Sequence, residues 1–159
     1  MDILLPAHVL VSLIGIASGV VILFGFFHSN RLDGWTALFM ATTAATSASG
    51  FLFPIHGVTP GIVVGIISLV VLAIATIARY ALHMAGAWRK IYVITAMIAL
   101  YLNCFVLIAQ LFRRVPFLTA LAPTQSEPPF AVAQGVLLLA FVILTIMAAS
   151  RFRTPIPAV

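Results

Sequence analysis

The sequence predicts an all-α fold, a polytopic transmembrane helical bundle that forms a single domain over residues 1–159. The first observation is composition, since 64% of the residues are hydrophobic and 7% are charged, against about 25% charged in soluble domains. The second is a mean hydropathy of +1.24. The third is spacing, because apolar stretches of about 20 residues, the length that crosses a bilayer as a helix, alternate with charged residues, prolines and glycines.

Five spans are predicted, and four are the alternative if one stretch lies on the membrane surface. The first ends at the polar run His28-Ser29-Asn30-Arg31, and the third begins at Pro60, which suits a first helical turn. The loop 113–129 contains prolines that rule out a continuous helix, and we expect it to cap the outer end of the bundle. The expected spans cover residues 7–27, 35–53, 60–80, 91–112 and 130–150.

The second span differs from the others, and we expect it to be the hub around which they pack. Between Trp35 and Pro54 it has no charge, and its hydroxyls fall on one helical face and its alanines on the other. Asn103 in the fourth span is expected to bond a hydroxyl of the hub, such as Thr46 or Thr43. The alternative is a ligand or water site between these two helices. The predicted polar core is Thr42, Thr43, Thr46, Ser47 and Asn103.

Each of the other spans carries one stripe of small or polar residues, which is expected to face the hub. In the first span the stripe includes Gly15 and Gly19, a GxxxG pair whose missing side chains let a neighbouring helix come close. The remaining surface of each span, mostly Leu, Ile, Val and Phe, is left to face lipid.

Basic residues predict the orientation, because cytoplasmic loops carry an excess of Lys and Arg. With five spans, Arg113 and Arg114 lie on one side and six basic residues on the other. We therefore expect a bacterial inner (cytoplasmic) membrane protein with its N-terminus outside and its C-terminus in the cytoplasm. The basic residues are scattered beside apolar spans, so no nucleic-acid partner is expected. The six residues are Arg31, Arg79, Arg89, Lys90, Arg151 and Arg153.

No catalytic motif is present, and the balance is against an enzyme. The sequence contains no GxSxG, HExxH or P-loop signature. No Asp, Glu, Lys or Arg lies in the middle of a span, which disfavours proton-coupled transport. An intramembrane serine protease needs a serine and a histidine at the same depth, whereas here the hydroxyls are central and the histidines lie near span ends. No catalytic residue is predicted.

The four histidines are the candidate cofactor ligands. With five spans, His8 and His56 lie at the outer ends of the first two spans, and His28 and His83 lie at the inner ends of the first and third. Two histidines at one depth on different helices could ligate a haem iron or another metal, and Glu127 could join an outer metal site. The alternative is that all four are interfacial or structural.

A basic inner mouth is a second candidate site. Arg79 and His83 are one helical turn apart, and Arg89 and Lys90 follow in the next connection. This group could hold an anionic lipid headgroup, and the alternative is ordinary positive-inside anchoring.

Three stretches carry a resemblance to known proteins: RLDGWTALFMATTAATSASGFLFP, GAWRKIYV and ALAPTQSEPPFAVAQG. With them most of the chain resembles small bacterial inner-membrane proteins that have no established activity. A second likeness is to small haem b membrane proteins of the cytochrome b561 type, which are histidine-bearing helical bundles. That resemblance implies haem b held by histidine pairs.

The leading functional hypothesis is a non-catalytic membrane protein, either an accessory subunit or a binder of lipid or another apolar molecule. The alternative is a membrane redox protein that holds haem b through histidine pairs at helix ends. A further alternative is a channel or carrier for a small neutral solute, which would use the hydroxyl face of the hub. The expected partners are membrane lipid and either a second copy of the chain or a larger membrane complex.

Overall fold

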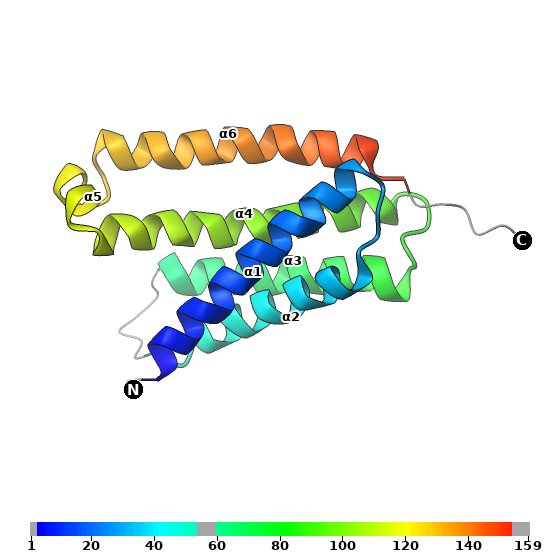
Figure 1. Cartoon of the computed structure of the whole chain (residues 1–159), viewed down its shortest axis with the longest axis horizontal. Coiled ribbons are helices and arrows are strands. Elements are labelled where there is room, and N and C mark those ends of the chain that lie inside the picture. Colours follow the sequence, from blue (N-terminus) through cyan, green and yellow to red (C-terminus); the bar gives the residue numbers. More distant parts are fainter. Residues whose placement is uncertain (1–2, 54–59, 154–159) are drawn as a thin grey trace, which may run out of the picture.

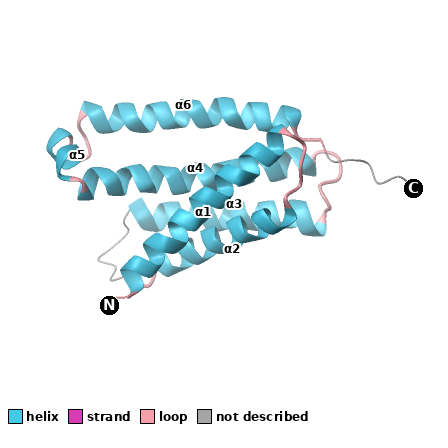
Figure 2. Ribbon diagram, in the orientation of Figure 1, coloured by secondary structure: helices cyan, strands magenta, loops and turns pink. Residues whose placement is uncertain are grey.

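The fold is a bundle of helices that run back and forth along one axis. The computed structural model describes residues 3–53 and 60–153, and every regular element in these two ranges is helical (Figure 2). Figure 1 shows the connections gathered at two opposite ends of the bundle. In chain order the elements are α1 (Leu4–Phe27), α2 (Asp33–Gly50), α3 (Pro60–Thr76), the π-helix η1 (Ile77–Ala81), α4 (Trp88–Arg114), α5 (Pro116–Leu121) and α6 (Pro128–Arg151).

Within the described residues, four helices are long and apolar enough to cross a membrane: Leu4–Phe27, Pro60–Ala81, Trp88–Arg114 and Pro128–Arg151. Length and composition therefore support four of the five predicted spans and not the fifth. The helix that falls short is α2, which has 18 residues, begins at a carboxylate and is rich in hydroxyls. It is nevertheless part of the bundle, where it lies antiparallel to α1 and packs against both α1 and α3 (Figure 1).

The centre of the bundle is α4, so the prediction that the second span is the hub is wrong. α4 packs against α1, α3, η1, α5 and α6, whereas α2 packs mainly against α1 and α3. The alanine face of α2, including Ala37, Ala41 and Ala45, is exposed on the outside of the bundle. α4 takes the central place because its small and polar residues, Ala96, Ala99 and Asn103 among them, are buried against neighbours.

The GxxxG pair of α1 lies where this helix packs against its neighbours, as predicted. A Cβ atom added at Gly19 would lie 2.4 Å from Leu100 Cδ1 of α4 and 3.0 Å from the Phe39 ring of α2. A Cβ atom at Gly15 would lie 3.2 Å from Thr42 Oγ1 and 3.3 Å from Thr43 Oγ1. The absence of side chains at both glycines therefore lets α1 touch α2 and α4 at the same level.

The loop predicted over residues 113–129 is partly helical and does not cap the whole bundle. α4 continues to Arg114, and α5 forms a separate short helix that packs against the end of α4. The prolines do break the chain as expected, since α5 and α6 each begin at one. Phe117 of α5 is 71% exposed and points away from the bundle core.

We expect Gly19→Ala to destabilise the bundle, because the new methyl group would push Leu100 and Phe39 apart. Overpacking of this kind lowers the free energy of unfolding by about 1–3 kcal/mol. The matched control is Gly135→Ala on α6, where an added Cβ meets no described atom within 4 Å. Thermal unfolding in mild detergent should show a lower midpoint for Gly19→Ala and an unchanged or slightly higher one for the control. Equal midpoints for the two variants would contradict the close contact.

Candidate functional site

The end of the bundle where α1, η1 and α6 finish contains a buried arginine. The third span finishes in η1, where the extra residue of a π-turn shifts the following side chains around the helix axis. The chain then reverses through His83 and Met84, whose φ angles of 50° and 56° lie in the left-handed region. The Met84 N–H donates to the Ala78 carbonyl at 2.8 Å, which holds Met84 in the core. This irregular ending turns Arg79 inward, toward α2 and α4.

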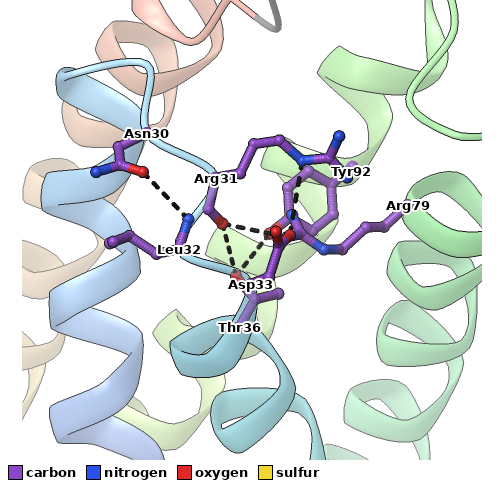
Figure 3. A network of polar contacts seen from close by, with 7 residues as sticks. All are labelled: Asn30, Arg31, Leu32, Asp33, Thr36, Arg79 and Tyr92. Atoms are coloured by element: carbon purple, nitrogen blue, oxygen red, sulfur yellow. Dashed lines mark hydrogen bonds and ion pairs between the residues drawn. The ribbon is translucent and has the colours of Figure 1, made fainter.

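Arg79 is 1% exposed, and its guanidinium contacts groups from three other parts of the chain (Figure 3). Its Nη2 donates to the carboxylate of Asp33, in the first turn of α2, and to the Arg31 carbonyl at 3.1 Å. Its carbon Cζ lies 5.0 Å from the centre of the Tyr92 ring of α4 and 5.6 Å from that of Tyr80. Nε and Nη1 are buried and have no hydrogen-bond partner in the described structure. The cation is therefore held by one carboxylate, one carbonyl and two aromatic faces.

Asp33 is shared between two arginines. Arg31 Nε lies 3.6 Å from the Asp33 carboxylate, and Arg31 is about half exposed, whereas Arg79 is enclosed. Leu32, which lies between Arg31 and Asp33 in the chain, has φ 42°, so the chain turns sharply just before α2 begins. Thr36 and Tyr92 are fully buried beneath this turn, and the Thr36 hydroxyl donates to the Arg31 carbonyl at 3.3 Å.

Positive charge is in excess at this end. Ser29 Oγ donates to the Arg151 carbonyl at 2.9 Å and accepts from the Arg153 N–H at 3.0 Å, so the end of α6 meets the α1–α2 turn. We call this the basic end. Among the described residues, its acidic side chain is Asp33. Its basic residues are Arg31, Arg79, Arg89, Lys90, Arg151 and Arg153.

The four residues predicted for a lipid headgroup do not form one open mouth. Arg79 is buried against Tyr92, whereas His83 is exposed in the left-handed turn, so the π-helix and the turn separate two residues expected one helical turn apart. Lys90 is exposed, and Arg89 is partly buried. Sequence reasoning missed Asp33 and Tyr92 as partners of Arg79. One signal could have found Asp33. The second span starts at the same end of the bundle where the third span finishes, so an acidic residue at that start can meet a basic residue at that finish.

The predicted hydrogen bond between Asn103 and the second helix is confirmed. Asn103 Nδ2 donates to Thr43 Oγ1 at 3.0 Å, and both residues are buried next to Gly15. The Thr42 hydroxyl donates instead to the Leu38 carbonyl of its own helix at 2.7 Å. Thr46 Oγ1 is buried with no hydrogen-bond partner among the described residues, and Ser47 is buried. The polar core is therefore one interhelical bond with hydroxyls around it, and no ligand site is needed to explain Asn103.

The three histidines in the described part of the chain, His8, His28 and His83, lie in three different environments. His8 Nδ1 lies 2.8 Å from Ser49 Oγ, and its ring packs edge-on against Phe53. A serine and a histidine therefore do meet at one depth, contrary to expectation, because Ser49 lies in the last turn of α2, at the level where α1 begins. The Ser49 hydroxyl also lies 3.1 Å from the Thr46 carbonyl, so it can donate there while it accepts from His8.

The predicted haem and metal arrangements gain no support from these positions. His28 Nδ1 donates to the Phe24 carbonyl at 2.8 Å, and His83 is exposed in its turn. His56 lies outside the described residues. Within the described ranges there is no group of three or more His, Cys, Asp or Glu side chains that could hold a metal ion.

Glu127, the further candidate for an outer metal site, caps its own loop. Its carboxylate accepts from the Thr124 hydroxyl at 2.8 Å and from the Ser126 N–H at 3.1 Å. Desolvation alone would raise the pKa of Glu127, but the hydrogen bonds from Thr124, from its own N–H and from Ser126 outweigh it, so the pKa lies below its ordinary value. These bonds orient the carboxylate toward the backbone that precedes α6.

An apolar groove of about 230 Å³ lies between α4 and α6. It opens on the outside of the bundle, and its lining residues come from the middle of both helices. Its walls include Met97 and Tyr101 from α4 and Phe141 and Ile146 from α6. Such a groove is suited to a hydrocarbon chain.

Comparison with protein-family models, with curated proteins and with solved structures found no match for this chain.

We expect the hydrogen bond between Thr43 and Asn103 to stabilise the bundle measurably. Thr43→Val keeps the shape but removes the acceptor, and Asn103→Leu removes the donor. In a double-mutant cycle the two substitutions should couple by about 0.6 kcal/mol, the average for such bonds in membrane proteins. The control cycle pairs Thr42→Val with Asn103→Leu, because Thr42 bonds its own helix. Unfolding in mixed micelles measures both cycles, and equal coupling in the two would contradict the assignment.

Proposed function

We propose that this protein is a non-catalytic, multi-pass protein of the bacterial inner membrane that binds anionic phospholipid. The observation that carries the proposal is the charge excess at the basic end, where six basic residues accompany Asp33. The headgroup of an anionic lipid supplies the missing negative charge, at about 1 kcal/mol for each basic residue near the surface. The positive-inside rule then places this end in the cytoplasm and the N-terminus outside.

The groove between α4 and α6 supports a lipid rather than a soluble anion as the ligand. It is lined almost entirely by hydrocarbon, with Tyr101 and Thr145 as its polar members. An acyl chain in the groove can extend along α4 and α6 toward the basic end, where the headgroup meets exposed side chains such as Lys90 and Arg153.

Five membrane crossings are part of the proposal, with α2 as the least apolar of them. A helix of 18 residues is about 27 Å long, close to the thickness of the hydrocarbon core. Its polar residues Thr36, Thr43 and Ser47 are buried against neighbouring helices, which shelter them from lipid. With α2 counted, Arg113 and Arg114 lie at the end opposite to the other basic residues, as the charge rule requires.

We expect phosphatidylglycerol to stabilise the purified protein more than phosphatidylcholine does, through the basic end. Lys90→Gln/Arg153→Gln should reduce this difference by about 1–2 kcal/mol. The control is Arg113→Gln/Arg114→Gln, which removes the same charge from exposed residues at the other end. Thermal unfolding in micelles doped with each lipid measures the effect. If both double variants lose the response equally, or neither loses it, the proposal fails.

We expect the two ends of α2 to lie on opposite sides of the membrane. With Cys104→Ser as background, Leu52→Cys should react with an impermeant maleimide in intact cells. Gly34→Cys should react only after the membrane is permeabilised. Both positions are exposed, so access depends on the side of the membrane and not on burial. Labelling of both from one side would contradict a crossing by α2.

A further inference from the structure

Arg79 has hydrogen-bonding capacity that its surroundings do not use. An arginine offers five N–H donors in a planar fork that matches the oxygens of carboxylate or phosphate. Two of its nitrogens, Nε and Nη1, are buried without a hydrogen-bond partner in the described part of the chain. A buried charged group left partly unpaired is costly, and such groups are rare without a reason.

Asp33 is the solvent-exposed partner of this enclosed arginine. Its side chain is 72% exposed, whereas that of Arg79 is fully enclosed, and the two are in direct contact. In Figure 3 the Asp33 carboxylate lies between Arg31 and Arg79. Among the described residues, the Asp33 carboxylate makes its polar contacts with these two arginines.

The chain around Asp33 and Arg79 is irregular on both sides. Leu32 adopts a left-handed conformation immediately before Asp33, and η1 with its left-handed turn follows Arg79. Sparsely populated backbone conformations and π-turns cost free energy and gather at ligand sites and switches. Two segments far apart in the sequence are thus both distorted where they meet.

We propose that Arg79 and Arg31 form a binding site for a phosphate group and that Asp33 occupies it as a built-in substitute anion. A phosphate displaces the carboxylate into solvent and takes its place between the two guanidiniums. Its oxygens are arranged tetrahedrally around phosphorus and are not confined to the plane of a carboxylate, so the unused donors of Arg79 gain partners. The phosphate is that of a lipid headgroup or a free phosphate ion. The inference deepens the proposed function, because it assigns the headgroup contact to two arginines and its control to Asp33.

The test replaces the built-in anion by an uncharged isostere. Asp33→Asn should bind phosphate at least about fivefold more tightly than the wild type, the lower end of what one charge at contact distance is worth in water. The probes are inorganic phosphate, at constant ionic strength with chloride as reference, and micelles doped with phosphatidylglycerol or phosphatidylcholine. The readout is the rise of the unfolding midpoint with probe concentration. Glu127→Gln is the matched control, because it removes the same charge at the other end.

Two double variants separate a built site from a general effect of charge. Both Asp33→Asn/Lys90→Gln and Asp33→Asn/Arg79→Gln have the net charge of the wild type at the basic end. The first keeps both arginines, so it should still bind phosphate about fivefold more tightly than the single variant Lys90→Gln. The second replaces the ion pair of Arg79 and Asp33 by two amides, so no charge is left buried and unpaired, and it should lose the tighter binding.

The outcomes distinguish the proposals from each other. A response to inorganic phosphate identifies the free ion as a ligand, and a response to phosphatidylglycerol alone identifies the lipid; either supports the site. No gain in Asp33→Asn, the same gain in Glu127→Gln, or no gain of Asp33→Asn/Lys90→Gln over Lys90→Gln would overturn it. If the wild type responds to phosphatidylglycerol while Asp33→Asn responds no better, lipid binding stands and the control by Asp33 falls. If no variant responds, both fall.

Discussion

The close contact of α1 with α2 and α4 at Gly15 and Gly19 is the constraint on which the rest of the bundle depends. Association of helices in lipid rests on packing and on interhelical hydrogen bonds, because lipid tails are as apolar as leucine. The two glycines supply the packing, and the bond from Asn103 to Thr43 lies beside them at 3.0 Å. Once these three helices are in register, the polar face of α2 is covered, and α3 completes its enclosure.

The register set at that contact also determines the chemistry of the basic end. It places the first turn of α2 opposite η1, so that Asp33 meets Arg79 and the Tyr92 ring of α4 lies beneath them. An enclosed guanidinium needs such partners, since an unpaired charge in a low-dielectric region is strongly unfavourable. The excess of positive charge left over is what makes this end suited to an anionic ligand.

Sequence reasoning succeeded where the signal was local. The limits of the long helices agree within a few residues, because apolar stretches bounded by prolines and charges specify where a helix begins and ends. It failed on the place of α2, which was expected at the centre and lies at the side. A helix with small side chains on both faces can pack against neighbouring helices through either face, and its composition does not say which. It also failed on the meeting of His8 with Ser49 and on the separation of Arg79 from His83, because both depend on how two helices are paired or how one helix ends.

The sequence by itself determined the class of the protein, the positions of its apolar helices and the unequal distribution of basic residues between its two ends. These follow from composition and spacing, which act residue by residue. Only the tertiary structure decided that α4 is central, that Asn103 bonds Thr43 and that Asp33 lies between two arginines. Arg31 and Asp33 are 2 positions apart in the chain, whereas Thr43 and Asn103 are 60 positions apart. The long-range contacts depend on the rotation and register of packed helices, which no single stretch of the chain encodes.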